Sequence, residues 1–254
     1  KGFFADNGVS VDITPTPGSK FQMVGLIDGD FDIAMTAMDN VVAYSEGQGA
    51  APTKTEPDIF AFMGVDNGFL RLVAVPEVKT VQDLKGKQVG VDALTTGYAF
   101  VLRKMLEIGN LSPDDFEFVE AGGVMERFGA LMDQKFAATL LISPLEAAAK
   151  RKGFNLLGNG SETLGAYQGV VGAARRDWAS ENADRLVGYI RGYQEAVEWL
   201  YDPANRDEAV AILGKHVPNM AGPVAEVSYG ILLDPQSGFF KDVALDQAGI
   251  ETVL

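Results

Sequence analysis

The fold is decided by residues 18–37, which read GSKFQMVGLIDGDFDIAMTA. The stretch opens with a glycine and Ser19, whose hydroxyl suits a helix cap because it can accept a bond from a free backbone N–H. Apolar residues then recur at helical spacing until an acidic turn at residues 28–30. The apolar run at residues 31–36 has the length of a buried strand. The stretch therefore predicts one α/β unit: a loop, a helix, a turn and a strand.

The same order of elements recurs at residues 123–142, which read GVMERFGALMDQKFAATLLI. Four of the twenty positions are identical when the two stretches are compared 105 positions apart. A helix, a glycine and a strand precede both stretches, with the expected strands at residues 9–13 and 116–120. This repeat predicts two similar α/β lobes. The alternative is that any two such units look alike.

The second lobe opens with a strand at residues 88–92, a loop at residues 93–97 and a helix from Tyr98. No matching strand and loop precede the first stretch. We therefore expect the opening strand of the first lobe, and any signal peptide, to lie outside this sequence.

The remaining elements assign the chain to two lobes. We expect lobe 1 to comprise residues 1–72 and 167–254, and lobe 2 to comprise residues 73–166, with hinges near residues 71–75 and 165–169. Because strands alternate with helices over short connections, the sequence predicts parallel sheets. Ligands of such sheets bind at the C-terminal ends of the strands, so a cleft between the lobes is the expected site.

The composition excludes several classes of protein. Lys and Arg number 21 and Asp and Glu number 35, so the formal charge of −14 repels a polyanion and argues against nucleic-acid binding. The chain has no cysteine and one histidine, which excludes disulfides, thiolate metal sites and two-histidine mechanisms. No apolar run reaches the ~18 residues of a membrane helix. We expect neither a cofactor nor a metal ion.

Three motifs resemble those of a known family. Residues 25–34 resemble the L-x-x-G-x-x-D-I-A signature of type 2 periplasmic substrate-binding proteins. Residues 83–91, which read DLKGKQVGV, are similar to the crossover of these proteins into the second lobe. Residues 199–209 resemble their late helix pair. The most similar group comprises the nitrate, sulfonate and taurine binding proteins and the binding proteins for thiamine pyrimidine precursors.

This resemblance implies a monomeric, two-lobed α/β protein that closes on a small organic anion or related solute. Such proteins deliver a sulfonate, taurine, carboxylate or similar compound to the membrane permease of an ABC importer. They are periplasmic or lipid-anchored outside the cytoplasmic membrane. Cytoplasmic enzymes share the fold, namely menaquinone-pathway dehydratases and pyrimidine-precursor synthases, and they remain the alternative. The synthases need a cysteine-rich segment, which this chain lacks.

Candidate binding residues of lobe 1 and the crossovers follow expected strands or open expected helices. Asp39 would receive an amine or a hydroxyl, or else cap the following helix. Asp66 and Asn67 line the cleft or form a turn. Tyr167 would cover a planar ligand, or serve in packing. The full set on this side is Ser19, Thr36, Met38, Asp39, Asp66, Asn67 and Tyr167.

Candidate binding residues of lobe 2 lie on matching loops. The segment from Thr95 to Gly97 precedes a helix, and its hydroxyls and backbone N–H groups suit an anion or a simple helix cap. Arg127 would pair with a sulfonate or carboxylate, or else with Glu126 or Glu120 on the surface. The full set is Thr95, Thr96, Gly97, Tyr98, Gly123, Arg127 and Ser143, which precedes Pro144.

Overall fold

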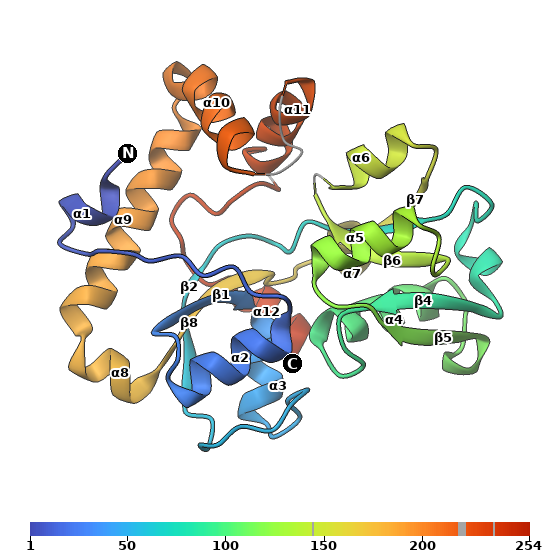
Figure 1. Ribbon diagram of the computed structural model, residues 1–254, viewed down its shortest axis with the longest axis horizontal. Helices are drawn as coiled ribbons and strands as arrows, with labels where there is room; N and C mark the ends of the chain where they lie inside the picture. Colours follow the sequence, from blue (N-terminus) through green and yellow to red (C-terminus); the bar gives the residue numbers. More distant parts are fainter. Residues whose placement is uncertain (144, 218–221, 236) are drawn as a thin grey trace.

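The computed structural model describes residues 1–143, 145–217, 222–235 and 237–254. Within these residues the strands form two sheets that lie side by side, each with helices packed on it (Figure 1). The first sheet has the order β1-β8-β2 and the second the order β5-β4-β6-β3-β7. The strands are β1 (Ile33–Ala37), β2 (Ile59–Gly64), β3 (Leu70–Ala74), β4 (Lys87–Val91), β5 (Phe116–Glu120), β6 (Ala138–Ile142), β7 (Asn155–Asn159) and β8 (Val170–Arg175).

The helices cover both sheets and extend beyond the first. The longest, α9, crosses behind the short α1 at the end of the molecule far from the second sheet (Figure 1). The helices are α1 (Phe3–Asp6), α2 (Ser19–Asp28), α3 (Met38–Ser45), α4 (Gly97–Ile108), α5 (Val124–Met132), α6 (Leu145–Arg151), α7 (Gly160–Leu164), α8 (Arg176–Glu181), α9 (Ala183–Tyr201), α10 (Arg206–His216), α11 (Pro223–Leu232) and α12 (Gln247–Val253).

Each sheet has its own apolar core. The second sheet and the helices α4 and α5 bury a continuous cluster around Leu72, Leu102 and Leu140, each at most 2% exposed. Two further clusters lie on the first sheet: one around Met23 and Leu26 joins it to α2, and one around Met63 and Tyr189 joins it to α9. The clusters of the two sheets share no residue, as two lobes require, because each lobe must bury its own apolar faces.

The 105-position repeat is confirmed by the elements. Shifted by 105 positions, β1 (Ile33–Ala37) coincides with β6 (Ala138–Ile142) at both ends, and the first residue of α2, Ser19, coincides with the first residue of α5, Val124. The α/β fold expected from the repeat is therefore present in both halves.

The strand expected at residues 9–13 is wrong, because the segment is irregular and largely solvent-exposed. Its counterpart in the repeat, β5, is held by a parallel ladder to β4 from Lys87 to Val91. Among the described strands none takes the place of β4 beside β1, so residues 9–13 have no neighbouring strand to pair with. Alternation of apolar and polar side chains is not enough to form a strand without such a partner.

The expectation of purely parallel sheets is also wrong, because each sheet contains one antiparallel strand. β8 runs antiparallel to β1 and β2, and β3 runs antiparallel to β6 and β7, whereas β4 is parallel to β5 and β6. The reason is the path of the chain. β3 and β8 each enter their sheet from the other sheet, and therefore start at the edge where the parallel strands end.

The two connections between the sheets lie at residues 65–69 and 165–169. The first was expected to bend at residues 71–75, but Leu70–Ala74 form β3 and pair with β6 and β7. Residues 70–72, assigned to lobe 1 from the sequence, therefore lie in the second sheet. The return connection is where the sequence placed it, and the hinge motion itself stays a prediction.

Asp66 ties the two connections together. One carboxylate oxygen accepts hydrogen bonds from the backbone N–H of Gly68 at 2.7 Å and of Val170 at 3.1 Å. The backbone carbonyl of Asp66 accepts a bond from the N–H of Gly169 at 2.9 Å. The C-terminal segment braces the same place, since the side chain of Gln168 accepts from the N–H of Asp246 at 2.8 Å. Asp66 is 4% exposed, so these bonds are made away from water.

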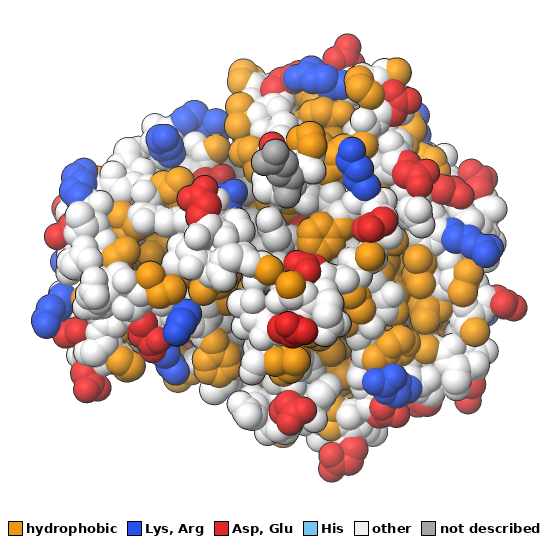
Figure 2. Space-filling view, turned by 180° about the vertical axis from the view of Figure 1, so that it is seen from behind, with side chains coloured by type: hydrophobic (Ala, Val, Ile, Leu, Met, Phe, Trp, Pro, Cys, Tyr) orange, Lys and Arg blue, Asp and Glu red, His pale blue; other side chains and the backbone are white. Residues whose placement is uncertain are grey.

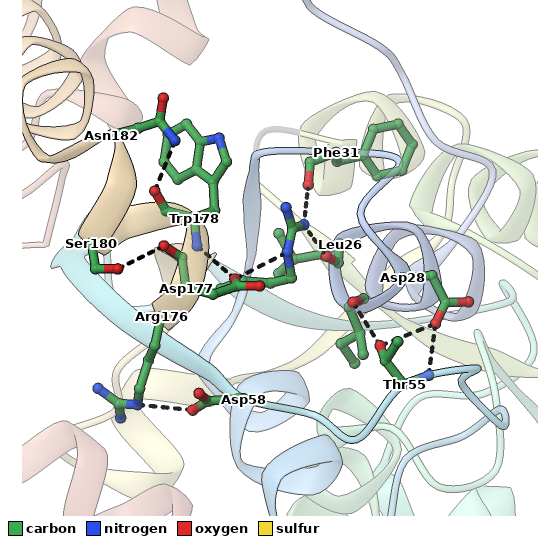
Figure 3. Close-up of polar contacts among 12 residues, drawn as sticks. Leu26, Asp28, Phe31, Thr55, Asp58, Arg176, Asp177, Trp178, Ser180 and Asn182 are labelled. Atoms are coloured by element: carbon green, nitrogen blue, oxygen red, sulfur yellow. Dashed lines mark hydrogen bonds and ion pairs between the residues drawn. The ribbon is translucent and has the colours of Figure 1, made fainter.

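The C-terminal end of α2 is anchored to β8 by an arginine. Figure 3 shows the carbonyl groups of Leu26 and Phe31, to which the Arg175 guanidinium donates at 2.6 and 2.9 Å. On the other side, the Thr55 hydroxyl donates to the Ile27 carbonyl at 3.0 Å. Bonds to the last carbonyls of a helix satisfy groups that otherwise lack partners, and a cation there also favours the helix dipole. This anchoring fixes the direction in which the other end of α2 points.

The surface carries no extensive basic patch on the side seen from behind, where acidic and basic side chains are interspersed (Figure 2). Among the residues that the structure describes, no helix is long and apolar enough to cross a membrane.

Replacing Asp66 by alanine is expected to destabilise the protein by about 2–4 kcal/mol, because two buried N–H groups lose their acceptor. Asp66→Asn keeps one acceptor oxygen and should cost less than about 1 kcal/mol. Urea unfolding of both variants at pH 7 measures the difference. Equal losses for the two variants would show that the tie does not depend on hydrogen bonding.

Candidate functional site

The candidate site lies between the two sheets, where the N-termini of α2, α3, α4 and α5 meet the ends of β1, β4 and the return connection. None of these four helices has a side chain that caps its first turn. The positive end of each helix dipole, with the N–H groups of the first turn, therefore lies in the region between the lobes.

Asp39, in the first turn of α3, lies at the centre of this region. It is 8% exposed, and one carboxylate oxygen, Oδ2, accepts a hydrogen bond from the Tyr167 hydroxyl at 2.8 Å. The other oxygen, Oδ1, is buried and has no hydrogen-bond partner. Tyr167 comes from the return connection, so this bond joins the first lobe to the crossing chain. The sequence prediction that Asp39 and Tyr167 share one site is consistent with this contact.

Asp39 packs directly on the N-terminus of α4 in the other lobe. A Cβ atom placed on Gly97 would lie 1.6 Å from the Asp39 carboxyl carbon. Only glycine therefore permits α3 and α4 to approach this closely. The half-buried side chain of Tyr98 follows Gly97 on α4 and interacts electrostatically with Asp39.

Asp92 joins α2 to α4 across the lobes. One of its carboxylate oxygens accepts a hydrogen bond from the Ser19 hydroxyl at 2.6 Å, and the other accepts a short bond from the Thr96 hydroxyl. Ser19 and Thr96 are two of the three hydroxyls, with that of Thr95, that were expected to bind a ligand anion. Here a carboxylate of the chain itself occupies that position.

The N-termini of α2 and α5 also meet. The N–H of Gly123 donates to the carbonyl of Pro17 at 3.1 Å, and Lys20 forms an ion pair with Glu120 at 3.0 Å. A pocket of about 370 Å³ lies at this junction. It is lined by residues of both lobes: Pro17, Gly18, Ser19, Lys20, Phe21, Asp92, Glu120, Ala121 and Gly122.

Arg127 is 3% exposed and lies in the first half of α5. Its guanidinium donates to the carbonyl of Gly122 at 2.7 Å and to that of Leu140 at 3.5 Å. Burial lowers the pKa of Arg127, and the nearby charge of Asp92 opposes this effect. The guanidinium is therefore inside the site region, held by backbone carbonyls rather than by Glu120 or Glu126.

Burial dominates the protonation of the central groups. It raises the pKa of Asp39 to about 7, although the bond from Tyr167 opposes the rise, and the charge of Asp92 adds to it. Burial likewise raises the pKa of Asp66 to about 6. The pKa values of Tyr98 and Tyr167 are well above the ordinary value, first because of burial and then because of the charge of Asp39.

Other predicted site residues lie nearby in structural roles. The Thr36 hydroxyl accepts from Asn40 at 3.1 Å, and the N–H of Met38 donates to Gly169 at 2.9 Å. Asn67 accepts from the N–H of Phe69 in a turn. These contacts shape the walls of the region, and a role in binding stays a prediction for each residue.

Two predicted residues lie apart from the central contacts. Thr95 is exposed. Ser143 is buried, and its hydroxyl donates to Glu146 at 2.7 Å. Pro144, which was considered together with Ser143, is outside the described residues.

Sequence reasoning missed Asp92, Lys20 and Glu120 as site residues. Asp92 directly follows the buried strand β4, which is the position that drew attention to Asp39 after β1. The same rule applied to β4 would have found it. Lys20 and Glu120 give no such signal, because their pairing depends on how the lobes come together.

Within the described ranges, no group of three or more His, Asp or Glu side chains is arranged to hold a metal ion.

Two α/β sheets joined by two crossings, with a pocket at their junction, define the periplasmic-binding-protein fold. The chain belongs to the NMT1/THI5-like family, whose model matches residues 1–206. A search of curated protein sequences finds no match to the chain.

Solved structures share this fold at low sequence identity. The alkanesulfonate-binding protein SsuA of Xanthomonas axonopodis pv. citri, bound to MOPS, is 20% identical with a TM-score of 0.70, over 85% of this chain and 72% of that chain. The ligand-binding component of an ABC-type import system of Staphylococcus aureus, with zinc bound, is 14% identical with a TM-score of 0.74, over 95% and 78%. A Candida albicans protein with the generic periplasmic-binding-protein fold is 14% identical with a TM-score of 0.74, over 99% and 82%.

The buried carboxyl of Asp39 is expected to make stability depend on pH. A folded-state pKa of about 7, raised by burial from 3.8, means that the stability it contributes is full below pH 4 and is lost as pH rises to 7. The loss amounts to at most about 1.4 kcal/mol per pH unit. Asp39→Asn should remove this dependence, which urea unfolding between pH 4 and pH 8 measures.

Tyr167→Phe serves as the companion variant. It removes the bond that favours the charged carboxylate, so the loss of stability should extend to higher pH than in the wild type. Parallel pH profiles for the wild type and Asp39→Asn would contradict the assignment.

Proposed function

We propose that this protein is the solute-binding component of an ABC importer and captures a small organic solute between its lobes. The observation that carries this proposal is the junction itself. The N-terminus of α2 and the loop that leads into α5, one from each lobe, line a pocket of about 370 Å³, and Asp92 in the same lining accepts a bond from Thr96 at the start of α4. Convergent donors and acceptors in a site between lobes are what ligand capture requires.

Closure of the lobes is supported by contacts that span them. Ser19 bonds to Asp92, Gly123 bonds to Pro17, and Asp39 packs on Gly97. Each contact joins an element of the first sheet's lobe to one of the second. Bending at the connections 65–69 and 165–169 would separate these surfaces and admit a solute.

The proposed solute carries an anionic group, as a sulfonate, taurine or a carboxylate does. Support comes from the N–H groups at the starts of α2, α4 and α5, which no side chain caps and which form a favourable environment for negative charge.

The proposed partner is a membrane permease, with the protein acting as a monomer outside the cytoplasmic membrane. Support comes from the solved structures that share the fold, of which one is titled an alkanesulfonate-binding protein and another a component of an import system. An enzyme on the same fold is the second candidate, because Asp39 has a pKa of about 7 and a hydroxyl partner, as a general acid or base would.

A thermal-shift screen tests capture. The panel contains nitrate, alkanesulfonates, taurine, carboxylates and aminopyrimidines. A ligand at 100 times its dissociation constant stabilises the folded state by ~2.7 kcal/mol, which raises the melting temperature by about 5–10 °C for a chain of this size. Recovery of an unchanged ligand by mass spectrometry supports capture. A chemically altered compound would favour the enzyme, and no hit from the panel would count against the proposed solute class.

Gly97→Ala tests closure. The added methyl group meets the Asp39 carboxyl carbon at 1.6 Å, so α3 and α4 must move apart and the affinity for a ligand found in the screen should fall at least tenfold. Gly129→Ala is the matched control, because a Cβ there meets nothing within 4 Å. It lies inside α5 and should stabilise the protein by about 0.5–1 kcal/mol with unchanged affinity. Wild-type affinity in Gly97→Ala would refute closure through this contact.

A further inference from the structure

The cluster at the centre of the site carries more negative than positive charge. Asp39, Asp66 and Asp92 contribute three carboxyl groups, and electrostatic interactions connect them with Arg127, Tyr98 and Tyr167. Within the described ranges, none of the ion pairs formed by Lys, Arg or His includes one of these three carboxylates. Asp39 and Asp66 are buried, and buried carboxylates without a cation are unfavourable, so the cluster is short of positive charge.

Two of the three carboxylates have their hydrogen bonds supplied by the chain. Asp66 accepts from two backbone N–H groups, and Asp92 accepts from the hydroxyls of Ser19 and Thr96. Of the two cations in this region, the buried Arg127 donates to backbone carbonyls and Lys20 pairs with Glu120. The shortage is therefore concentrated on Asp39.

Asp39 has one satisfied and one unsatisfied oxygen. Its Oδ2 accepts a hydrogen bond from the Tyr167 hydroxyl at 2.8 Å, whereas its Oδ1 is buried and has no hydrogen-bond partner. Asp39 as a whole is 8% exposed. A buried carboxylate oxygen without a donor is uncommon, and it destabilises the folded state most when it is charged. A donor that carries positive charge would satisfy both the oxygen and the charge of the cluster.

We propose that the captured solute carries a protonated amine, which donates a hydrogen bond to Asp39 Oδ1. This inference rests on the proposed function and narrows its solute class to compounds that bear an ammonium group together with an anionic group. The ammonium group faces Asp39 and Asp92, while the anionic group faces the free N–H groups of the helix N-termini. A simple anion such as nitrate would leave Oδ1 unsatisfied and add to the negative charge.

Protonation of Asp39 supports this assignment. With a pKa raised to about 7, the carboxyl holds a proton in much of the empty protein near neutral pH. An arriving ammonium group replaces that proton. Asp92, Tyr98 and Tyr167 interact with Asp39 directly, and Asp66 and Arg127 interact with Tyr98 beside it. The helix α12, which also packs on α3, carries Glu251, which is exposed.

The first experiment uses pairs of solutes that differ by the amine: 2-aminoethanesulfonate against 2-hydroxyethanesulfonate, and 4-aminobutanoate against butanoate. Calorimetry on the wild type at pH 8 should show at least tenfold tighter binding of an aminated member. That affinity should fall up to tenfold between pH 8 and pH 6, because Asp39 is protonated at the lower pH. For the same reason, binding near pH 7 should release protons, which is measured by comparing titrations in phosphate and in Tris buffer. In Asp39→Asn the preference for the amine should be lost.

A second measurement uses fragments and decides the matter even if no pair binds. Methylammonium chloride should raise the melting temperature of the wild type at pH 8 above its value in equimolar sodium chloride. Tetramethylammonium, which has the charge but no N–H donor, should not. Asp39→Asn should respond equally to all three salts.

The outcomes separate the two proposals. Equal or tighter binding of the solute without an amine, or an amine preference that persists in Asp39→Asn, overturns the ammonium site and leaves solute capture intact. If no pair binds, the proposed solute class fails, and the methylammonium response alone supports or overturns the role of Asp39. Failure of methylammonium to stabilise the wild type above sodium, with no pair bound, overturns it.

Discussion

Both passages of the chain between the lobes are held by one buried carboxylate, that of Asp66. Its side chain and its backbone carbonyl accept hydrogen bonds from N–H groups of both connections or their ends. The two connections are therefore tied together at this one residue and form a single joint. The C-terminal segment braces this joint through Gln168. Tyr167, whose hydroxyl donates to Asp39, is the residue next to Gln168 in this joint.

The position of this joint also explains why acidic residues gather in the site. Because the connections start where the parallel strands end, residues that follow those strands are brought together, and several of them are acidic. Asp39 follows β1 and Asp92 follows β4, and both then lie near helix N-termini, where negative charge is favoured. Both oxygens of Asp92 accept hydrogen bonds, from the hydroxyls of Ser19 and Thr96, whereas one oxygen of Asp39 has no hydrogen-bond partner. This difference between two similar carboxylates is the reason for proposing Asp39, and not Asp92, as the residue that a solute contacts.

Much of the fold could be predicted from the sequence because it is repeated. The glycine loop, helix, turn and strand of residues 18–37 recur 105 positions later, and β1 and β6 coincide under that shift. What failed was the direction of β3 and β8 and the pairing of residues 9–13. Strand direction depends on the path of the chain between lobes, and pairing depends on a neighbouring strand. Neither strand direction nor strand pairing can be derived from the local alternation of side chains.

The candidate site could be predicted only in part. Position after a strand was enough to select Asp39, and position on the crossing was enough to select Tyr167. Their contact at 2.8 Å spans 128 residues and depends on the final arrangement of the lobes, as does the pairing of Lys20 with Glu120. Arg127 was selected for pairing with an anion, yet its guanidinium is held by backbone carbonyls that no sequence pattern reveals.

Because Gly97 has no side chain, the closeness of α3 and α4 and the choice of solute can be considered as two separate properties of the molecule. The closeness of α3 and α4 is limited by this single position, where one extra carbon would overlap Asp39. The side chains proposed to meet a solute also include those of other residues, among them Tyr98 and Tyr167. Under this proposal, exchanging those two side chains would change specificity without changing the contact between Asp39 and residue 97. A redesign that altered residue 97 would separate α3 from α4 whatever solute was chosen.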